Sequence, residues 1–240
     1  MKKSTFFLVA LCSGTLLVAS CSSDKTADNT ATTTETTTPD ATASGDMTGM
    51  DHSKMADGSM AGDSPLMASM NDRMGKMSAM KMKGNTDHDF AHMMMEHHKG
   101  AVAMANIELR DGKDAPMKQM ADKIKADLQK EIGEMAPIAE RLDSAPSNYK
   151  PMDPADPFTS KMKVSMDGMM QGMPKTVANP DMNFNMLMTV HHQSAVDMAK
   201  AELAHGKDTK LKGIAQMIID AQQKEIAEFK AWHDKNADKM

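Results

Sequence analysis

The chain repeats itself at an offset of 94 residues, and this internal duplication limits the possible folds more than any other feature of the sequence. Residues 87–139 align with residues 181–233 without a gap, and 22 of the 53 aligned positions are identical. The copies share an HH pair at residues 97–98 and 191–192, and a QKEI segment further on. A duplication of this kind predicts two copies of one supersecondary unit that bury their apolar faces against each other.

Each copy has the residue pattern of two consecutive helices. In the first copy, apolar and small residues recur every three or four positions from Phe90 to Glu108, and Gly112 follows as an expected C-cap. A second helix is expected from about Pro116 to Leu142, and its counterpart from Leu211 to Trp232. No useful length of the chain alternates as a strand does. The expected fold class is therefore all-α, with the duplicated helical-hairpin unit forming a four-helix bundle.

A shorter methionine-bearing segment precedes each copy. Its methionines step by three and four positions within residues 65–83, and again within residues 158–173, which predicts two additional short Met-rich helices. The expected organisation is a first helical repeat over residues 64–142, a Pro-rich linker over residues 143–156 and a second helical repeat over residues 157–240. The sequence leaves open whether the two His pairs face each other or lie at opposite ends of the bundle.

The N-terminal residues predict a lipoprotein signal peptide over residues 1–20. Two lysines precede an apolar run over residues 6–17, which is too short to span about 30 Å of hydrocarbon, and small residues lead to Cys21. Cleavage would make Cys21 a lipid-carrying N-terminus, so we expect anchoring to a bacterial membrane, in the periplasm or at the cell surface. Residues 21–63 are expected to be a disordered Thr/Ser/Asp-rich tether with a Met/His-rich segment. The formal net charge is −5 and no basic patch is present, so no nucleic-acid partner is expected.

Methionine makes up 30 of the 240 residues, whereas aromatic residues make up 3%. Burying a methionine costs about 1.5–2 kcal/mol of rotamer entropy, so packing alone does not favour this composition. Thioether sulfur prefers soft ions such as Cu(I), and neither cysteine remains as a thiol once Cys12 leaves with the signal peptide and Cys21 is acylated. The composition therefore predicts a protein that binds Cu(I), with Ag(I) as a second candidate, through Met and His.

The candidate metal ligands are soft donors placed at helical spacing. Met94 lies one turn before His98, and Met188 lies one turn before His192. The alternative for each His is an ordinary hydrogen bond across the helical core. A further i, i+4 His pair lies away from the apolar stripe, and a GMDHSKM segment lies in the tether. The complete candidate set is Met50, His52, Met55, His88, His92, Met94, His97, His98, Met104, Met188, His191, His192 and Met198.

Enzymatic signatures are absent from the sequence, so no catalytic residues and no enzyme activity are expected. Glu131, Glu134, Glu225 and Glu228 lie among Lys and Gln and are expected to be solvated charges. Two alternatives to a Cu(I)-binding protein stay open. A ferritin-like di-iron oxidase would use the Glu-x-x-His step that ends at His205, although the first copy lacks that histidine. A Met-rich oxidant sink would cycle thioethers through sulfoxide.

The pattern DxxFxxxMxxHHxxAxxMA, followed by a glycine and QxEI, resembles the domain-of-unknown-function 305 family. It occurs from Asp87 to Ile132 and again from Asp181 to Ile226. The resemblance implies a ferritin-like helical bundle. It also implies copper or silver binding through Met and His, as in the CopM-like periplasmic proteins of that family. Other copper-handling proteins are then expected partners, and the ion would be buffered, held for resistance or passed on.

Overall fold

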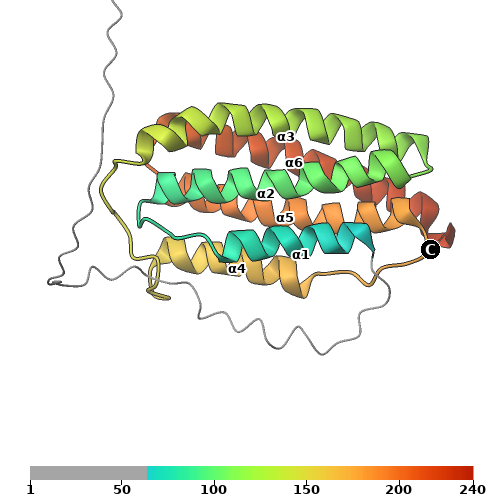
Figure 1. The fold of residues 1–240 in the computed structure, drawn as a ribbon, viewed down its shortest axis with the longest axis horizontal. Coiled ribbons are helices and arrows are strands. Elements are labelled where there is room, and N and C mark those ends of the chain that lie inside the picture. Colours follow the sequence, from blue (N-terminus) through green and yellow to red (C-terminus); the bar gives the residue numbers. More distant parts are fainter. Residues whose placement is uncertain (1–63, 240) are drawn as a thin grey trace, which may run out of the picture. The chain divides into compact units, whose positions relative to one another are not determined.

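A computed structural model describes residues 64–239. These residues form six α-helices and a short 3-10 helix, with no strand among them, which confirms the all-α prediction (Figure 1). The elements are α1 (Pro65–Ser78), α2 (Thr86–Asp111), α3 (Ala115–Leu142), α4 (Pro157–Gln171), α5 (Pro180–His205), α6 (Thr209–Asn236) and η2 (Ala237–Lys239). The expected signal peptide, Cys21, the tether and the Met50, His52 and Met55 segment lie outside the described residues.

The local sequence explains where the helices begin. Asn85 caps α2 by accepting a hydrogen bond from the His88 N–H. Asp114 caps α3 and Asp208 caps α6 in the same way. Proline occupies the first turn of α1, α3, α4 and α5, where its missing N–H has no helical partner to lose.

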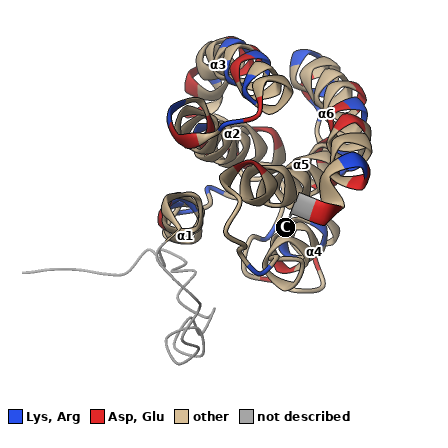
Figure 2. Ribbon diagram, turned by 90° about the vertical axis from the view of Figure 1, so that its right-hand side faces the viewer, with Lys and Arg blue, Asp and Glu red and all other residues tan. Residues whose placement is uncertain are grey.

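The helices stack in three layers of two. Helices α3 and α6 form one layer, α2 and α5 the middle layer, and α1 and α4 the third (Figures 1 and 2). Within each copy the two long helices pack as a hairpin, α2 on α3 and α5 on α6, while α2 packs directly on α5. The four long helices are the predicted bundle, and the two short Met-rich helices cover its middle layer from the other side.

Helices α2 and α5 are buried on most of their faces because other helices lie on both sides of them. Fully buried alanines such as Ala101, Ala105, Ala195 and Ala199 leave room for close approach of the backbones. Figure 2 shows that charged residues line the outer faces of α3 and α6, whereas α5 carries few. Within residues 64–239, no helix has both the length and the apolar character needed to cross a bilayer.

The two copies are related by an approximate two-fold axis. The Asp87 carboxylate at the start of α2 accepts hydrogen bonds from the N–H groups of Lys207 and Asp208, after the end of α5, at 2.7 and 2.6 Å. The counterpart of Asp87, Asp181, accepts from Lys113 and Asp114 at 2.8 Å each. These reciprocal bonds make α2 and α5 antiparallel, so residues near the middle of each helix meet at the axis.

Candidate metal centre

Two histidines meet at the axis between the copies. The rings of His97 on α2 and His191 on α5 stack with their centroids 3.7 Å apart and their planes tilted by 37°. The two side chains are 0% and 3% exposed, and each ring lies 6.5 Å from that of the following histidine on its own helix. The structure therefore decides the question that the sequence left open, because the two His pairs face each other in the core.

The central histidines are uncharged at neutral pH. Burial lowers the pKa of His97 well below its usual value, and the neighbouring His98 and His192 lower it further. Burial and the other three histidines act on the pKa of His191 in the same direction, against a smaller opposite effect from a hydrogen bond to the His97 backbone. Neutral imidazole is the form that binds metal ions.

Each outer histidine of the four is held by a carboxylate from the second helix of its own copy. His98 Nε2 lies 2.8 Å from Glu131 on α3, and His192 Nε2 lies 3.1 Å from Glu225 on α6. Burial would raise the pKa of Glu225, but His192 and Lys123 together bring it below its usual value. Carboxylates that hold a ring nitrogen in this way orient histidine ligands in metal sites.

The prediction that Glu131 and Glu225 are solvated charges is wrong. Their side chains are 14% and 6% exposed, because each glutamate points from its helix toward a histidine of α2 or α5. Glu134 and Glu228, one turn further on, are 40% and 43% exposed and pair with lysines, as expected. The repetition of QKEI in both copies was no signal of this burial, since the exposed Glu134 and Glu228 repeat as well.

Six buried ring nitrogens in this core have no hydrogen-bond partner. They are the Nδ1 atoms of His97, His98, His191 and His192, and the Nε2 atoms of His97 and His192. In His98 the Glu131 carboxylate bonds to Nε2, which leaves Nδ1 with a free lone pair when the ring is neutral, whereas His192 Nε2 only lies 3.1 Å from Glu225. An unpartnered buried polar atom costs about 1–3 kcal/mol, so six of them together are a substantial cost.

Four of the predicted methionine ligands share this core. Met94, Met104, Met188 and Met198 are all 0% exposed. Met94 lies four residues before His98, and Met188 lies four residues before His192, which brings each pair of Cβ atoms to about 5–6 Å. The thioethers therefore accompany the histidines, at positions where leucine would fill the same space.

A separate cluster forms at the first turns of α2. The predicted pair His88 and His92 lies beside Asp143, which follows the end of α3, and one ligand atom from each of the three lies within 4.8 Å of the others. Within residues 64–239, no other three His, Asp or Glu side chains have ligand atoms this close together. The sequence did not point to Asp143, because this residue follows His92 by 51 positions and lies beside it only through the packing of the α2–α3 hairpin.

The carboxyl groups of the di-iron alternative lie at opposite ends of the middle layer. Glu202 lies near Asp87, and Glu108 lies near Asp181. Since Asp87 and Glu108 are 21 residues apart on α2, the two glutamates are separated by about 30 Å along the helix. This separation excludes a carboxylate pair shared by Glu108 and Glu202.

These features define the chain as a duplicated all-α protein with a core rich in histidine and methionine. The model of a family described as a domain of unknown function (DUF305) matches residues 19–138 and again residues 87–233. The chain belongs to the DUF305 family, as the motif resemblance predicted.

Solved structures similar to this chain include CopM in the apo form, with 28% identity over 62% of this chain and 96% of that chain and a TM-score of 0.48. CopM in the Cu(I)-bound form has 28% identity with the same coverage and a TM-score of 0.47. A DUF305 fragment from Deinococcus radiodurans has 21% identity over 62% of this chain and 96% of the fragment, with a TM-score of 0.46. No curated protein sequence matches the chain.

Proposed function

We propose that this chain binds Cu(I), and also Ag(I), in its core and acts by binding the ion rather than by catalysis. The ligands would be the Nδ1 atoms of the four core histidines together with Met94, Met104, Met188 and Met198. A lipid on Cys21 would anchor the protein outside the cytoplasm. There the protein would buffer the ion, contribute to copper resistance or pass the ion to another copper-handling protein.

The observation that carries the proposal is the set of four buried Nδ1 atoms without partners. Ordinary core histidines have both nitrogens hydrogen-bonded, because an unmet acceptor destabilises the fold. Here the Nε2 atoms of His98 and His192 face carboxylates and the Nδ1 atoms face none. Metal ions would give those lone pairs the partners that the protein does not provide, although within residues 64–239 no three of these histidines have ligand atoms within 4.8 Å of one another to share one ion.

The chemistry of the donor set favours a soft monovalent ion. Imidazole and thioether together suit Cu(I), and Ag(I) shares this preference. The fully buried surroundings exclude water, which would otherwise compete as a ligand and expose Cu(I) to oxidation. Since the thioethers have no proton to lose, only the imidazoles make binding depend on pH.

Protons compete weakly for this site. The pKa of His97 and of His191 lies well below the usual 6.5, so both rings keep their lone pairs free in mildly acid solution. We therefore expect Cu(I) affinity to persist below pH 6, at which a solvent-exposed histidine site would already be protonated and weakened.

A competition titration tests the core site. The whole chain carrying Cys21→Ser, whose appearance in the soluble fraction tests the anchor, is titrated with Cu(I) against bicinchoninate under anaerobic, reducing conditions. The double variant His97→Phe/His191→Phe keeps two stacked rings but removes four nitrogens, and we expect at least a tenfold loss of affinity. Met94→Leu/Met188→Leu should also weaken binding, whereas Met152→Leu, at a 50% exposed position, is the matched control.

The outcomes separate the alternatives. Unchanged Cu(I) affinity in the His97→Phe/His191→Phe variant, with an unchanged circular dichroism spectrum, would contradict the core site. The Met-rich oxidant sink predicts that oxidant protection survives this double substitution. That alternative gains little from the structure, because most core methionines are shielded from solvent.

A further inference from the structure

We propose that His88, His92 and Asp143 form a second metal site, specific for a borderline divalent cation such as Cu²⁺ or Zn²⁺ and distinct from the Cu(I) core. The site uses two imidazole nitrogens and one carboxylate and contains no sulfur. It does not depend on the proposed core function, because its ligands, its metal class and its position at the first turns of α2 are all different.

The ligand atoms are already spaced as a bound ion requires. His88 Nε2 and His92 Nε2 lie 3.1 and 3.5 Å from the same oxygen, Asp143 Oδ1. The two rings lie side by side with centroids 4.4 Å apart, as their i, i+4 spacing allows. Ligands bound tetrahedrally at about 2.0–2.1 Å from zinc stand about 3.3 Å from one another, close to the observed separations.

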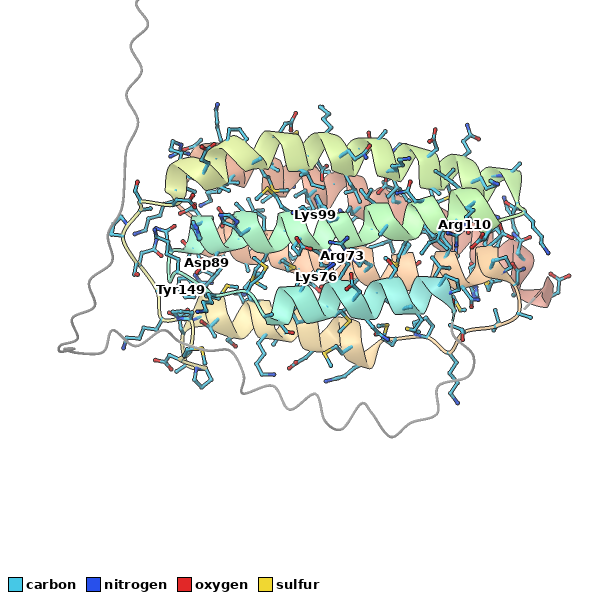
Figure 3. The ribbon with its side chains drawn as sticks, in the orientation of Figure 1. Arg73, Lys76, Asp89, Lys99, Arg110 and Tyr149 are labelled. Atoms are coloured by element: carbon cyan, nitrogen blue, oxygen red, sulfur yellow. The ribbon has the colours of Figure 1, made fainter. Side chains whose placement is uncertain are left out.

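A buried carboxylate fixes which nitrogen of His88 is free. Asp89 Oδ1 lies 2.7 Å from His88 Nδ1 and also accepts from the Lys83 N–H, while Oδ2 accepts from the Gly84 N–H and the Tyr149 hydroxyl. Figure 3 shows Asp89 and Tyr149 at the same end of the molecule. Burial and Asp89 raise the pKa of Tyr149, so it remains a donor. The proton of a neutral His88 therefore sits on Nδ1, and the lone pair of Nε2 faces Asp143.

This arrangement leaves two acceptors in contact. With neutral His88, Nε2 and Asp143 Oδ1 both present lone pairs at 3.1 Å, so a proton or a metal ion has to lie between them. His92 Nε2 is buried and has no hydrogen-bond partner, although the same oxygen is 3.5 Å away. One cation bound by all three atoms satisfies both nitrogens, whereas one proton on His88 leaves His92 unpartnered.

The second copy of the repeat provides an internal comparison. At the offset of 94 residues, Met182 and Met186 replace the two histidines, Asn183 replaces Asp89, and Ala237 replaces Asp143. Asn183 still binds the backbone of Val177, the counterpart of Lys83, through both its oxygen and its nitrogen. The segment before α5 thus bonds to an amide side chain in place of the Asp89 carboxylate. The second copy therefore folds without counterparts of His88, His92 and Asp143.

The charges at the site suit a divalent ion. Asp89 and Asp143 contribute two negative charges, and Lys83, whose Nζ donates to the backbone carbonyl of Asp143, contributes one positive charge. The Asp143 side chain is 61% exposed, so an ion can enter from solvent. Imidazole and carboxylate donors favour Cu²⁺ and Zn²⁺ over Cu(I), and among divalent ions the general affinity order places Cu²⁺ above Zn²⁺.

The test is a metal titration of the whole Cys21→Ser chain with Cu²⁺ and with Zn²⁺ in separate arms. Electron paramagnetic resonance reports the nitrogens bound to Cu²⁺, and calorimetry reports the affinity for both ions. We expect His92→Gln and Asp143→Asn each to lower both affinities at least tenfold, and His92→Gln to remove one nitrogen from the spectrum. Both positions are at least partly exposed, and circular dichroism checks that each variant folds.

Two controls keep this site separate from the core and from the tether. The His97→Phe/His191→Phe variant should keep its Cu²⁺ signal, and His92→Gln should keep its Cu(I) affinity. Replacing His52 with Gln should leave the two-nitrogen Cu²⁺ spectrum unchanged. Cu²⁺ and Zn²⁺ affinities within twofold of the parent chain in both His92→Gln and Asp143→Asn would overturn the proposal, whatever the core binds.

Discussion

Two buried glutamates at the ends of the middle layer hold protons that free glutamates would release. Burial is the main cause that raises the pKa of Glu202 to about 9, and the nearby Asp87 raises it further. Burial and Asp181 raise the pKa of Glu108 to about 8. Neither Glu108 nor Glu202 accepts a hydrogen bond from an N–H or O–H donor, so a proton on each allows it to donate to its aspartate neighbour. In the unfolded chain both groups titrate near 4.5.

We expect the free energy of unfolding to fall as pH rises from 7 to 9. In this range the folded chain keeps protons on Glu108 and Glu202 that the unfolded chain has lost, so raising the pH favours unfolding, by at most about 1.4 kcal/mol per pH unit for each group. The stabilisation is complete below pH 4.5 and is lost as pH passes through about 8 and 9. The lowered pKa values of His97 and His191 change the free energy of unfolding only below pH 6.5, so they do not affect this range.

Urea unfolding at pH 7, 8 and 9 measures this effect. The total loss expected over the range is about 2–4 kcal/mol. Glu202→Gln imitates the protonated side chain, so its stability should fall less than that of the parent chain, particularly between pH 8 and 9. A parent chain equally stable at pH 7 and 9 would show that the two carboxyl groups are ionised throughout.

The two middle helices end in glycines for a steric reason. Gly112 and Gly206 have extended backbones, with φ of −63° and −64°, which any residue adopts. However, a Cβ on Gly206 would lie 2.1 Å from Glu202 Oε1 and 2.7 Å from the Glu202 carbonyl oxygen. The Glu202 carboxyl therefore occupies the space that a side chain at position 206 would need, and it packs against the C-terminal end of α5.

We expect Gly206→Ala to destabilise the protein by about 1–3 kcal/mol, because the new methyl group displaces the Glu202 carboxyl from its buried position. Gly213→Ala is the matched control, since nothing lies within 4 Å of its Cβ inside α6. Alanine at that helical position should stabilise by about 0.5–1 kcal/mol. Thermal unfolding of both variants decides the matter, and equal shifts in the same direction would refute this account of the helix end.

The whole described structure consists of two similar halves joined at the α2–α5 contact. The bonds of Asp87 and Asp181 and the stacked rings of His97 and His191 all cross this contact. Because the linker residues 148 and 149 bond to Gly84, the natural division between halves falls after residue 156. The proposed metal-binding core thus lies between the copies and requires both of them.

We expect residues 64–156 and 157–240, produced as separate chains, to associate in a one-to-one complex. Asp181→Ala in the second fragment should weaken the complex by about 1–3 kcal/mol, because two backbone N–H groups lose their acceptor. Asp197→Ala, at a 41% exposed position on the same helix, is the control. Size-exclusion chromatography with light scattering distinguishes the complex from separate fragments. Two fragments that stay apart would show that the linker, and not the contact, holds the halves together.

The sequence predicted the helices well, because their signals are local. Proline in first turns, Gly112 after α2 and methionines at helical spacing depend only on neighbouring residues, and the internal repeat doubled each signal. The same local logic failed for Glu131 and Glu225, whose QKEI context is that of a solvated helix face. Their burial arises from packing against His98 and His192, which lie 33 residues away in each copy.

By itself, the sequence determined the helical class, the duplication and the set of soft donors, since composition and period are properties of single segments. The tertiary structure alone decided which donors meet. The antiparallel packing of α2 on α5 stacked His97 on His191, and the hairpin return brought Asp143 to His88 and His92. Distances between separate helices depend on how whole faces pack together, and no local pattern encodes them.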